Sequence, residues 1–114
     1  MITLPMPPSL NNLFFSRAKG RTRSAAYVRW IEQAGWEIAR QRPEKVKGKV
    51  SVSIQVEDTD NRRTDLDGRA KAVLDLLVTH QIIEDDSKQF VRSIHLAWNK
   101  DIIGAQVEIL PLGE

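Results

Sequence analysis

The strongest constraint on the fold is a short stretch of alternating residues near the middle of the chain. Between residues 50 and 56, every even position carries valine or isoleucine and every odd position carries serine or glutamine. Side chains of a β-strand point alternately to its two faces, so this pattern predicts a strand with one buried face. A sheet with one apolar face needs a second layer to cover it. The rest of the chain has to supply that layer.

Two segments that flank this strand have the spacing of amphipathic helices. The first extends from an N-cap at Ser24 to about Arg40, before Pro43, and the second extends from Thr64 to about Thr79. Their expected inner faces consist of Tyr27, Trp30, Ile31, Ala34 and Ile38 in the first helix and Leu66, Ala70, Val73, Leu74 and Leu77 in the second. These two helices are the predicted covering layer.

Further strands are expected at residues 2–6, around Phe90 to Trp98, and from Ala105 to Leu110, where Pro111 ends the last one. The basic segment 15–23 is expected to be a loop. The predicted order is β–α–β–α–β–β, which indicates the α+β class. We therefore predict one small domain over residues 1–114, with a mixed sheet of about four strands and two main helices packed on it.

Composition excludes several classes of protein. The chain has no cysteine, so disulfides, thiolate zinc sites and cysteine nucleophiles are ruled out. No apolar run approaches the ~20 residues that span a bilayer, and the start lacks the features of a secretory signal. We expect a cytoplasmic protein with no membrane partner.

Charge is distributed unevenly along the sequence, although the net charge is only +2. Residues 1–49 contain ten basic and three acidic side chains, whereas residues 50–114 contain seven basic and twelve acidic ones. This asymmetry suggests that one part binds a polyanion and that the acidic part does something else. The alternative is that these charges are solvated and mix on folding.

The predicted second helix carries the first candidate for chemistry. Asp67, Lys71 and Asp75 are spaced by four residues and share one side of that helix, with Asp65 at its start. A structural explanation is available, because acidic residues at a helix start cap it and a pair of opposite charges four residues apart stabilises its surface.

A second acidic group, Glu84-Asp85-Asp86, follows the same helix. Alone, such a run is typical of a solvated turn. Together with the first group and a lysine, it supplies the parts of a metal-dependent phosphodiesterase site, because carboxylates suit Mg²⁺ and Mn²⁺ and lysine suits a phosphate.

In these features the sequence resembles the RusA-type Holliday junction resolvases, a family of crossover junction endodeoxyribonucleases found in bacteria and their prophages. The resemblance spans nearly the whole chain. It includes the opening strand with its Pro7-Pro8-Ser9-Leu10-Asn11 turn, the Gly20-Arg21-Thr22 segment, Asp65-Leu66-Asp67 with Lys71, and Asp85-Asp86. Two positions depart from the family pattern: Gly68, where asparagine is frequent, and Thr64, where relatives can have arginine.

The resemblance implies a homodimer that uses Mg²⁺, or Mn²⁺ in its place, to nick two opposed strands of a four-way junction in DNA recombination and repair. It implies that Asp65, Asp67 and Asp86 bind the metal, that Lys71 is catalytic, and that Asp85 and Asp75 are possible further acids around the metal. No small-molecule cofactor is implied.

For contacts with branched DNA we expect the basic residues of the N-terminal half and of the central segments, namely Arg17, Lys19, Arg21, Arg23, Arg62, Arg63 and Arg69. The alternative function is a non-catalytic DNA-binding module whose acidic residues only cap helices and solvate turns.

Overall fold

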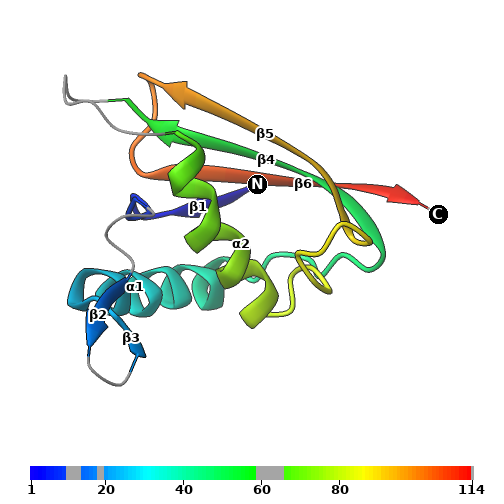
Figure 1. Ribbon diagram of the computed structural model, residues 1–114. Coiled ribbons are helices and arrows are strands. Elements are labelled where there is room, and N and C mark those ends of the chain that lie inside the picture. Colours follow the sequence, from blue (N-terminus) through cyan, green and yellow to red (C-terminus); the bar gives the residue numbers. More distant parts are fainter. Residues whose placement is uncertain (10–13, 18–19, 59–65, 114) are drawn as a thin grey trace.

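A computed structural model describes residues 1–9, 14–17, 20–58 and 66–113 of the chain (Figure 1). Its helices are α1 (Ala25–Gln41), the short 3₁₀ helix η2 (Asp67–Arg69) and α2 (Ala70–Thr79). Its strands are β1 (Ile2–Leu4), β2 (Phe14–Arg17), β3 (Gly20–Arg23), β4 (Lys49–Glu57), β5 (Val91–Asn99) and β6 (Ala105–Gly113).

Four of the strands form a mixed sheet in the order β1-β6-β4-β5. Strands β4 and β5 are parallel and are joined by the crossover through α2, whereas β6 is antiparallel to both β4 and β1. Figure 1 shows α1 and α2 on the same side of this sheet. The predicted α+β class, with a four-stranded mixed sheet and two main helices, is confirmed.

The core lies between this sheet and the two helices. Every second residue of β4, from Val50 to Val56, is fully buried, as the alternation predicts. Facing it are Tyr27, Trp30, Ala34 and Ile38 of α1 and Ala70, Ala72, Val73, Leu76 and Leu77 of α2. Among the described residues, no helix is long and apolar enough to cross a membrane.

Helix α1 is fixed at both ends by polar contacts. The Ser24 hydroxyl accepts a hydrogen bond from the Tyr27 amide at 3.1 Å and so acts as the predicted N-cap. Near the other end, the Gln41 side chain pairs with both backbone groups of Thr3 in β1, at 2.8 and 2.7 Å. Because β1 is an edge strand, the backbone N–H and C=O of Thr3 would face solvent without the Gln41 side chain, which binds both.

The basic segment predicted to be a loop is instead a two-stranded sheet of β2 and β3, in which Phe14 pairs with Arg23 and Arg17 pairs with Gly20. Gly20 and the surrounding basic residues are typical of a loop, but Gly20 begins a strand. The backbone of this basic segment therefore lies on two paired antiparallel strands.

Two boundaries also differ from the prediction. Strand β6 continues through Pro111, where it still pairs with β4. On its other edge, β6 pairs with β1 only at residues 105–107, so beyond them this edge has no partner strand among the described residues. A proline, which has no N–H to donate, is tolerated at such an edge. The second helix begins as η2 at Asp67 and becomes α-helical only at Ala70, whereas Thr64, its predicted start, lies outside the described residues.

The turn at Gly104 yields a stability prediction. Gly104 has a φ of 73°, and a Cβ there would overlap the Leu4 carbonyl oxygen. Gly48 has a φ of 80° but open space around the same position. We expect Gly48→Ala to cost roughly 1–2 kcal/mol for the left-handed backbone alone, and Gly104→Ala to cost clearly more.

Thermal unfolding of both variants measures this difference, at roughly 4 °C per kcal/mol. Equal melting temperatures for the two variants would show that the close approach of β1 to this turn is not maintained in solution.

Candidate active site

The exposed side of α2 carries three of the residues singled out in the sequence. Lys71 lies in the first turn, and its Nζ is 3.2 Å from Oδ1 of Asp75, one turn further along. Asp67 is exposed in η2, directly before the helix, four residues ahead of Lys71. The Thr79 hydroxyl continues the row and donates to the Asp75 carbonyl at 2.8 Å. The structure therefore places a lysine between two carboxylates along one helix.

Helix stabilisation accounts for Asp67 but not for Lys71. A helix favours acidic side chains in its first turn and basic ones in its last turn. Asp67 lies in the first turn of η2, whereas α2 has no acid in its first turn and no base in its last turn. Lys71 instead lies at the positive end of the α2 dipole. The residues at the N-cap positions, Leu66 for η2 and Arg69 for α2, make no side-chain capping hydrogen bond.

Asp75 also borders a small cavity of about 80 Å³ between α1 and α2. The Arg23 guanidinium, from the end of β3, and the Tyr27 ring line the same cavity, with the guanidinium carbon 5.7 Å from the ring centroid. Burial raises the pKa of Tyr27, and the charge of Asp75 raises it further, whereas Arg23 and Lys71 act in the opposite direction. Tyr27 thus interacts electrostatically with Asp75, Arg23 and Lys71. This electrostatic group connects the hairpin of β2 and β3 (the basic hairpin) to the exposed side of α2 (the α2 face).

The second acidic group lies elsewhere, at the beginning of the central strands. The Glu84 carboxylate accepts a hydrogen bond from the Gly48 amide at 2.8 Å, just before β4 begins. The Val50 amide donates to the Phe90 carbonyl at 2.8 Å, just before β5 begins. Asp85 and Asp86 lie between these two anchored points, near the amino-terminal ends of β4 and β5.

Asp67 lies at the opposite end of the sheet. Within the same short helix, the Arg69 guanidinium donates to the Pro7 carbonyl at 2.6 Å. Pro7 follows β1, whose Leu4 is aligned through β6 with Val56 at the carboxyl end of β4. The nine residues of β4 extend over roughly 30 Å. Asp67 and Asp86 of one chain are therefore too far apart to bind the same ion.

This separation agrees with the absence of a cluster of three or more His, Asp or Glu side chains that could hold a metal, within the described ranges. Asp65, the remaining predicted ligand, lies outside the described residues. The chemistry of the donors still suits a hard divalent cation, because all three predicted ligands are carboxylates.

The predicted DNA contacts are distributed over several parts of the structure. Arg17 lies at the end of β2, and Arg21 and Arg23 lie in β3, with Arg23 exposed. Arg69 is half-buried, and its hydrogen bond to Pro7 gives it a structural role. Lys19, Arg62 and Arg63 lie outside the described residues.

Sequence reasoning placed Tyr27 only in the core and did not foresee its second position beside Asp75. Tyr27 begins the inner stripe of α1, directly after the basic segment, and its hydroxyl is the polar end of an otherwise apolar row; this pattern indicates that the hydroxyl needs a polar neighbour but does not identify Asp75.

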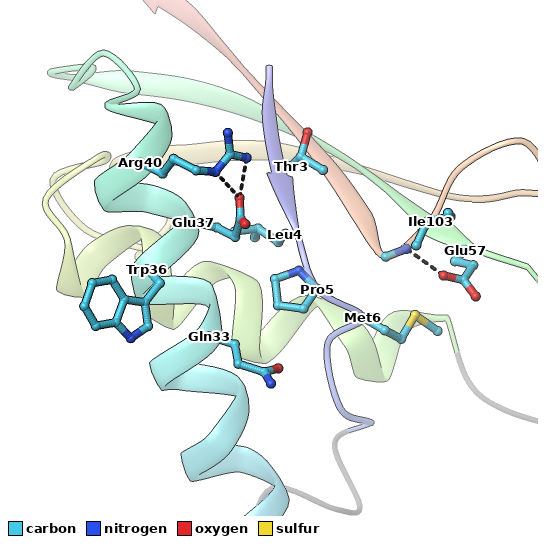
Figure 2. A pocket seen from close by; sticks show the side chains of 11 residues that line it. Thr3, Leu4, Pro5, Met6, Gln33, Trp36, Glu37, Arg40, Glu57 and Ile103 are labelled. Carbon is cyan, nitrogen blue, oxygen red and sulfur yellow. Dashed lines mark hydrogen bonds and ion pairs between the residues drawn. The ribbon is translucent and has the colours of Figure 1, made fainter.

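A larger groove of about 690 Å³ lies on the other side of α1 (Figure 2). Trp36, 78 % exposed, and Ile103, 86 % exposed, belong to its lining, and Glu37 and Arg40 form an ion pair of 2.6 Å on its wall. Of the acidic residues and the lysine predicted from the sequence to form the site, none that the structure describes lines this groove. The α2 face is therefore the candidate active site.

A protein-family model described as Endodeoxyribonuclease RusA matches residues 5–110. The search of curated proteins found no match.

The electrostatic group around Tyr27 yields a prediction that is independent of any activity. The chain has a single tyrosine, so its ultraviolet titration reports Tyr27 alone. Because Asp75 raises the pKa of Tyr27, we expect Asp75→Asn to lower this pKa. Glu37→Gln, which removes an acidic charge from the far side of α1, serves as the control and is expected to leave the titration unchanged.

The raised pKa also sets the pH dependence of stability. The phenol is held neutral in the folded state, so it contributes to the free energy of unfolding. This contribution is fully present below the unfolded pKa of 10.0 and is lost as the pH rises through the folded pKa.

Superimposable ultraviolet titration curves for wild type and Asp75→Asn would contradict the proximity of Tyr27 and Asp75.

Proposed function

Because this chain belongs to the RusA endodeoxyribonuclease family, we propose that it resolves four-way DNA junctions by paired, symmetric, metal-dependent nicks. The observation that carries the proposal is the row of Asp67 in η2 and Lys71 and Asp75 on the exposed side of α2, in which Lys71 lies in the first turn of α2 and precedes its acid, an order that does not stabilise the helix. The proposed catalytic residues are Asp65, Asp67, Lys71 and Asp86. The proposed setting is DNA recombination and repair.

Lys71 is suited to bind the DNA backbone at the point of cleavage. Its side chain is about half-exposed, and its ammonium group has three N–H donors, of which one is directed to Asp75. The remaining donors are available for a non-bridging phosphate oxygen. Negative charge develops there and on the leaving oxygen during hydrolysis, and a fixed positive charge nearby stabilises it.

Asp65 and Asp67, with Asp86, are proposed to hold Mg²⁺, or Mn²⁺ as a substitute. A divalent cation bound there would offset charge on the scissile phosphate and activate water. The carboxylates themselves position the cation and, without it, would repel the DNA backbone. Asp85 is proposed as a neighbouring acid of this arrangement.

The distance between Asp67 and Asp86 within one chain supports an active site to which two protomers contribute (the shared site). Cation and ligand oxygens lie only ~2.1 Å apart in a magnesium site, which the length of β4 prevents for these two residues of one chain. A two-fold dimer brings unlike patches of its subunits together twice, and each such meeting can pair Asp67 of one protomer with the partner's Asp86. We propose that the active form is this homodimer, with two equivalent sites for two equivalent strands.

The basic hairpin of β2 and β3 is the proposed DNA-binding element, through Arg17, Lys19, Arg21 and Arg23. Arg23 lies beside the Asp75 cavity, so a backbone that follows the hairpin reaches the α2 face. Arg62 and Arg63 are further proposed DNA contacts. Arg69 is proposed to contact DNA as well, in addition to supporting η2 through its hydrogen bond to Pro7.

Cleavage of a labelled synthetic four-way junction tests the activity. We expect wild-type protein to nick two opposed strands in Mg²⁺ or Mn²⁺, and we expect Asp67→Asn to lose about 100-fold or more of this activity, since a metal contributes several kcal/mol to such a reaction. Asp101→Asn, the same change on the exposed turn between β5 and β6, is the control and is expected to cut normally.

Junction binding by wild-type protein without any nicking would favour the non-catalytic DNA-binding module instead. Undiminished cutting by Asp67→Asn would remove Asp67 from the site.

A mixing experiment tests the shared site. Asp67→Asn and Asp86→Asn chains are expected to be inactive as homodimers. In their heterodimer, one of the two shared sites carries both substitutions and the other carries none. We therefore expect the purified heterodimer to cut one strand of the junction and not the opposed one.

If instead each site were built within one chain, both sites of the heterodimer would be damaged. A heterodimer as inactive as the two homodimers, beside an active wild type, would thus exclude the shared site while leaving the nuclease activity in place.

A further inference from the structure

We propose that Asp75 is a positioning residue that holds the ammonium group of Lys71 for contact with the scissile phosphate. The inference rests on the proposed function and deepens it. It gives Asp75 a role through the lysine, in place of a role beside the metal.

The contact itself is the first observation. Oδ1 of Asp75 lies 3.2 Å from Nζ of Lys71, and the two residues are one helical turn apart. A lysine side chain has a flexible four-carbon stem and, without a partner, distributes its charge over many rotamers. Pairing with Asp75 restricts Nζ to the row between Asp67 and Asp75, and leaves other N–H donors for an oxygen of the substrate.

The charge order is the second observation. Pairs of opposite charge on helices stabilise them best when the acid precedes the base, and here the base comes first. Lys71 is in the first turn of α2, where the helix dipole disfavours a positive charge. A pair that existed only to stabilise α2 would have the opposite order.

The surroundings of Asp75 are the third observation. Its side chain is only one-third exposed, less than that of Lys71, which is about half-exposed. It borders the cavity that Arg23 and Tyr27 also line, so α1 and the end of β3 enclose it from the other side. The more enclosed partner of the pair is therefore the acid, as expected of the group that positions the other.

The cavity also connects Asp75 to the proposed DNA-binding hairpin. Arg23 ends β3, and its guanidinium is directed over the Tyr27 ring beside Asp75. The proposed phosphate contacts of the hairpin would therefore end beside the residue that holds Lys71.

Steady-state nicking of the four-way junction in Mg²⁺ tests the proposal with Asp75→Asn and Asp75→Glu. We expect Asp75→Asn to lower kcat about 10- to 100-fold, because a displaced catalytic group costs this much, while KM stays within twofold. Asp75→Glu keeps the charge and is expected to recover part of the loss. A role in folding alone would lower the melting temperature and would not separate kcat from KM in this way.

A double-mutant cycle with Lys71→Gln tests whether Asp75 acts through the lysine. Once Lys71 is replaced, Asp75→Asn is expected to cause no further loss of kcat. Glu37→Gln breaks a comparable surface pair, that of Glu37 and Arg40 on α1, and is expected to leave kcat unchanged in both backgrounds.

A wild-type kcat for Asp75→Asn would overturn the inference, and so would a further loss in the Lys71→Gln background. Both outcomes leave the proposed nuclease function intact. Failure of wild-type protein to nick any junction would instead refute the proposed function, and this inference with it.

Discussion

The buried face of β4 is the constraint on which the other elements depend. Four residues of this strand have no exposed surface, and the strand pairs along its whole length with β5 on one side and β6 on the other. A strand buried on one face must be covered, and α1 and α2 cover it from the same side. This packing on β4 determines the position of α2, and with it the positions of Lys71 and Asp75 on the outer side of the helix.

The same strand determines what one chain can do alone. The segment between β4 and α2 leaves from the carboxyl end of β4, and the segment between α2 and β5 returns to its amino-terminal end. Acidic residues at the two ends of α2 therefore belong to opposite ends of the sheet. A βαβ connection imposes this separation whatever the sequence of its loops, because parallel neighbours must begin at the same edge.

Local patterns made much of this fold predictable. The alternation of β4 and the stripe of α1 are set by neighbours within two to four residues, and both appear where they were expected. The pairing of Lys71 with Asp75 was equally accessible, since a spacing of four residues is a neighbouring position on a helix. The turn at Asn99 is another local feature, with its side chain accepting from the Asp101 amide at 2.8 Å.

Features that depend on distant partners were not predictable. Pro111 appeared to end a strand because the sequence does not show that one edge of β6 is free there. The location of Asp67 and Asp86 at opposite ends of the sheet was hidden too, because spacing along the chain does not reveal the end of the sheet at which each residue lies. The meeting of Tyr27 with Asp75 depends on how α1 crosses α2, which no local pattern contains.

The hydrogen bond from Arg69 to the Pro7 carbonyl makes the amino-terminal strand part of the support of η2, although the two are far apart in the sequence. Trp30 holds the same segment from α1, through its indole N–H and the Pro5 carbonyl at 3.0 Å. Residues 1–9 thus connect the first helix to the start of the helix that carries the acids. The amino-terminal strand therefore leads directly into the support of η2, whereas β6 reaches away from α2 toward its end at Gly113 (Figure 1).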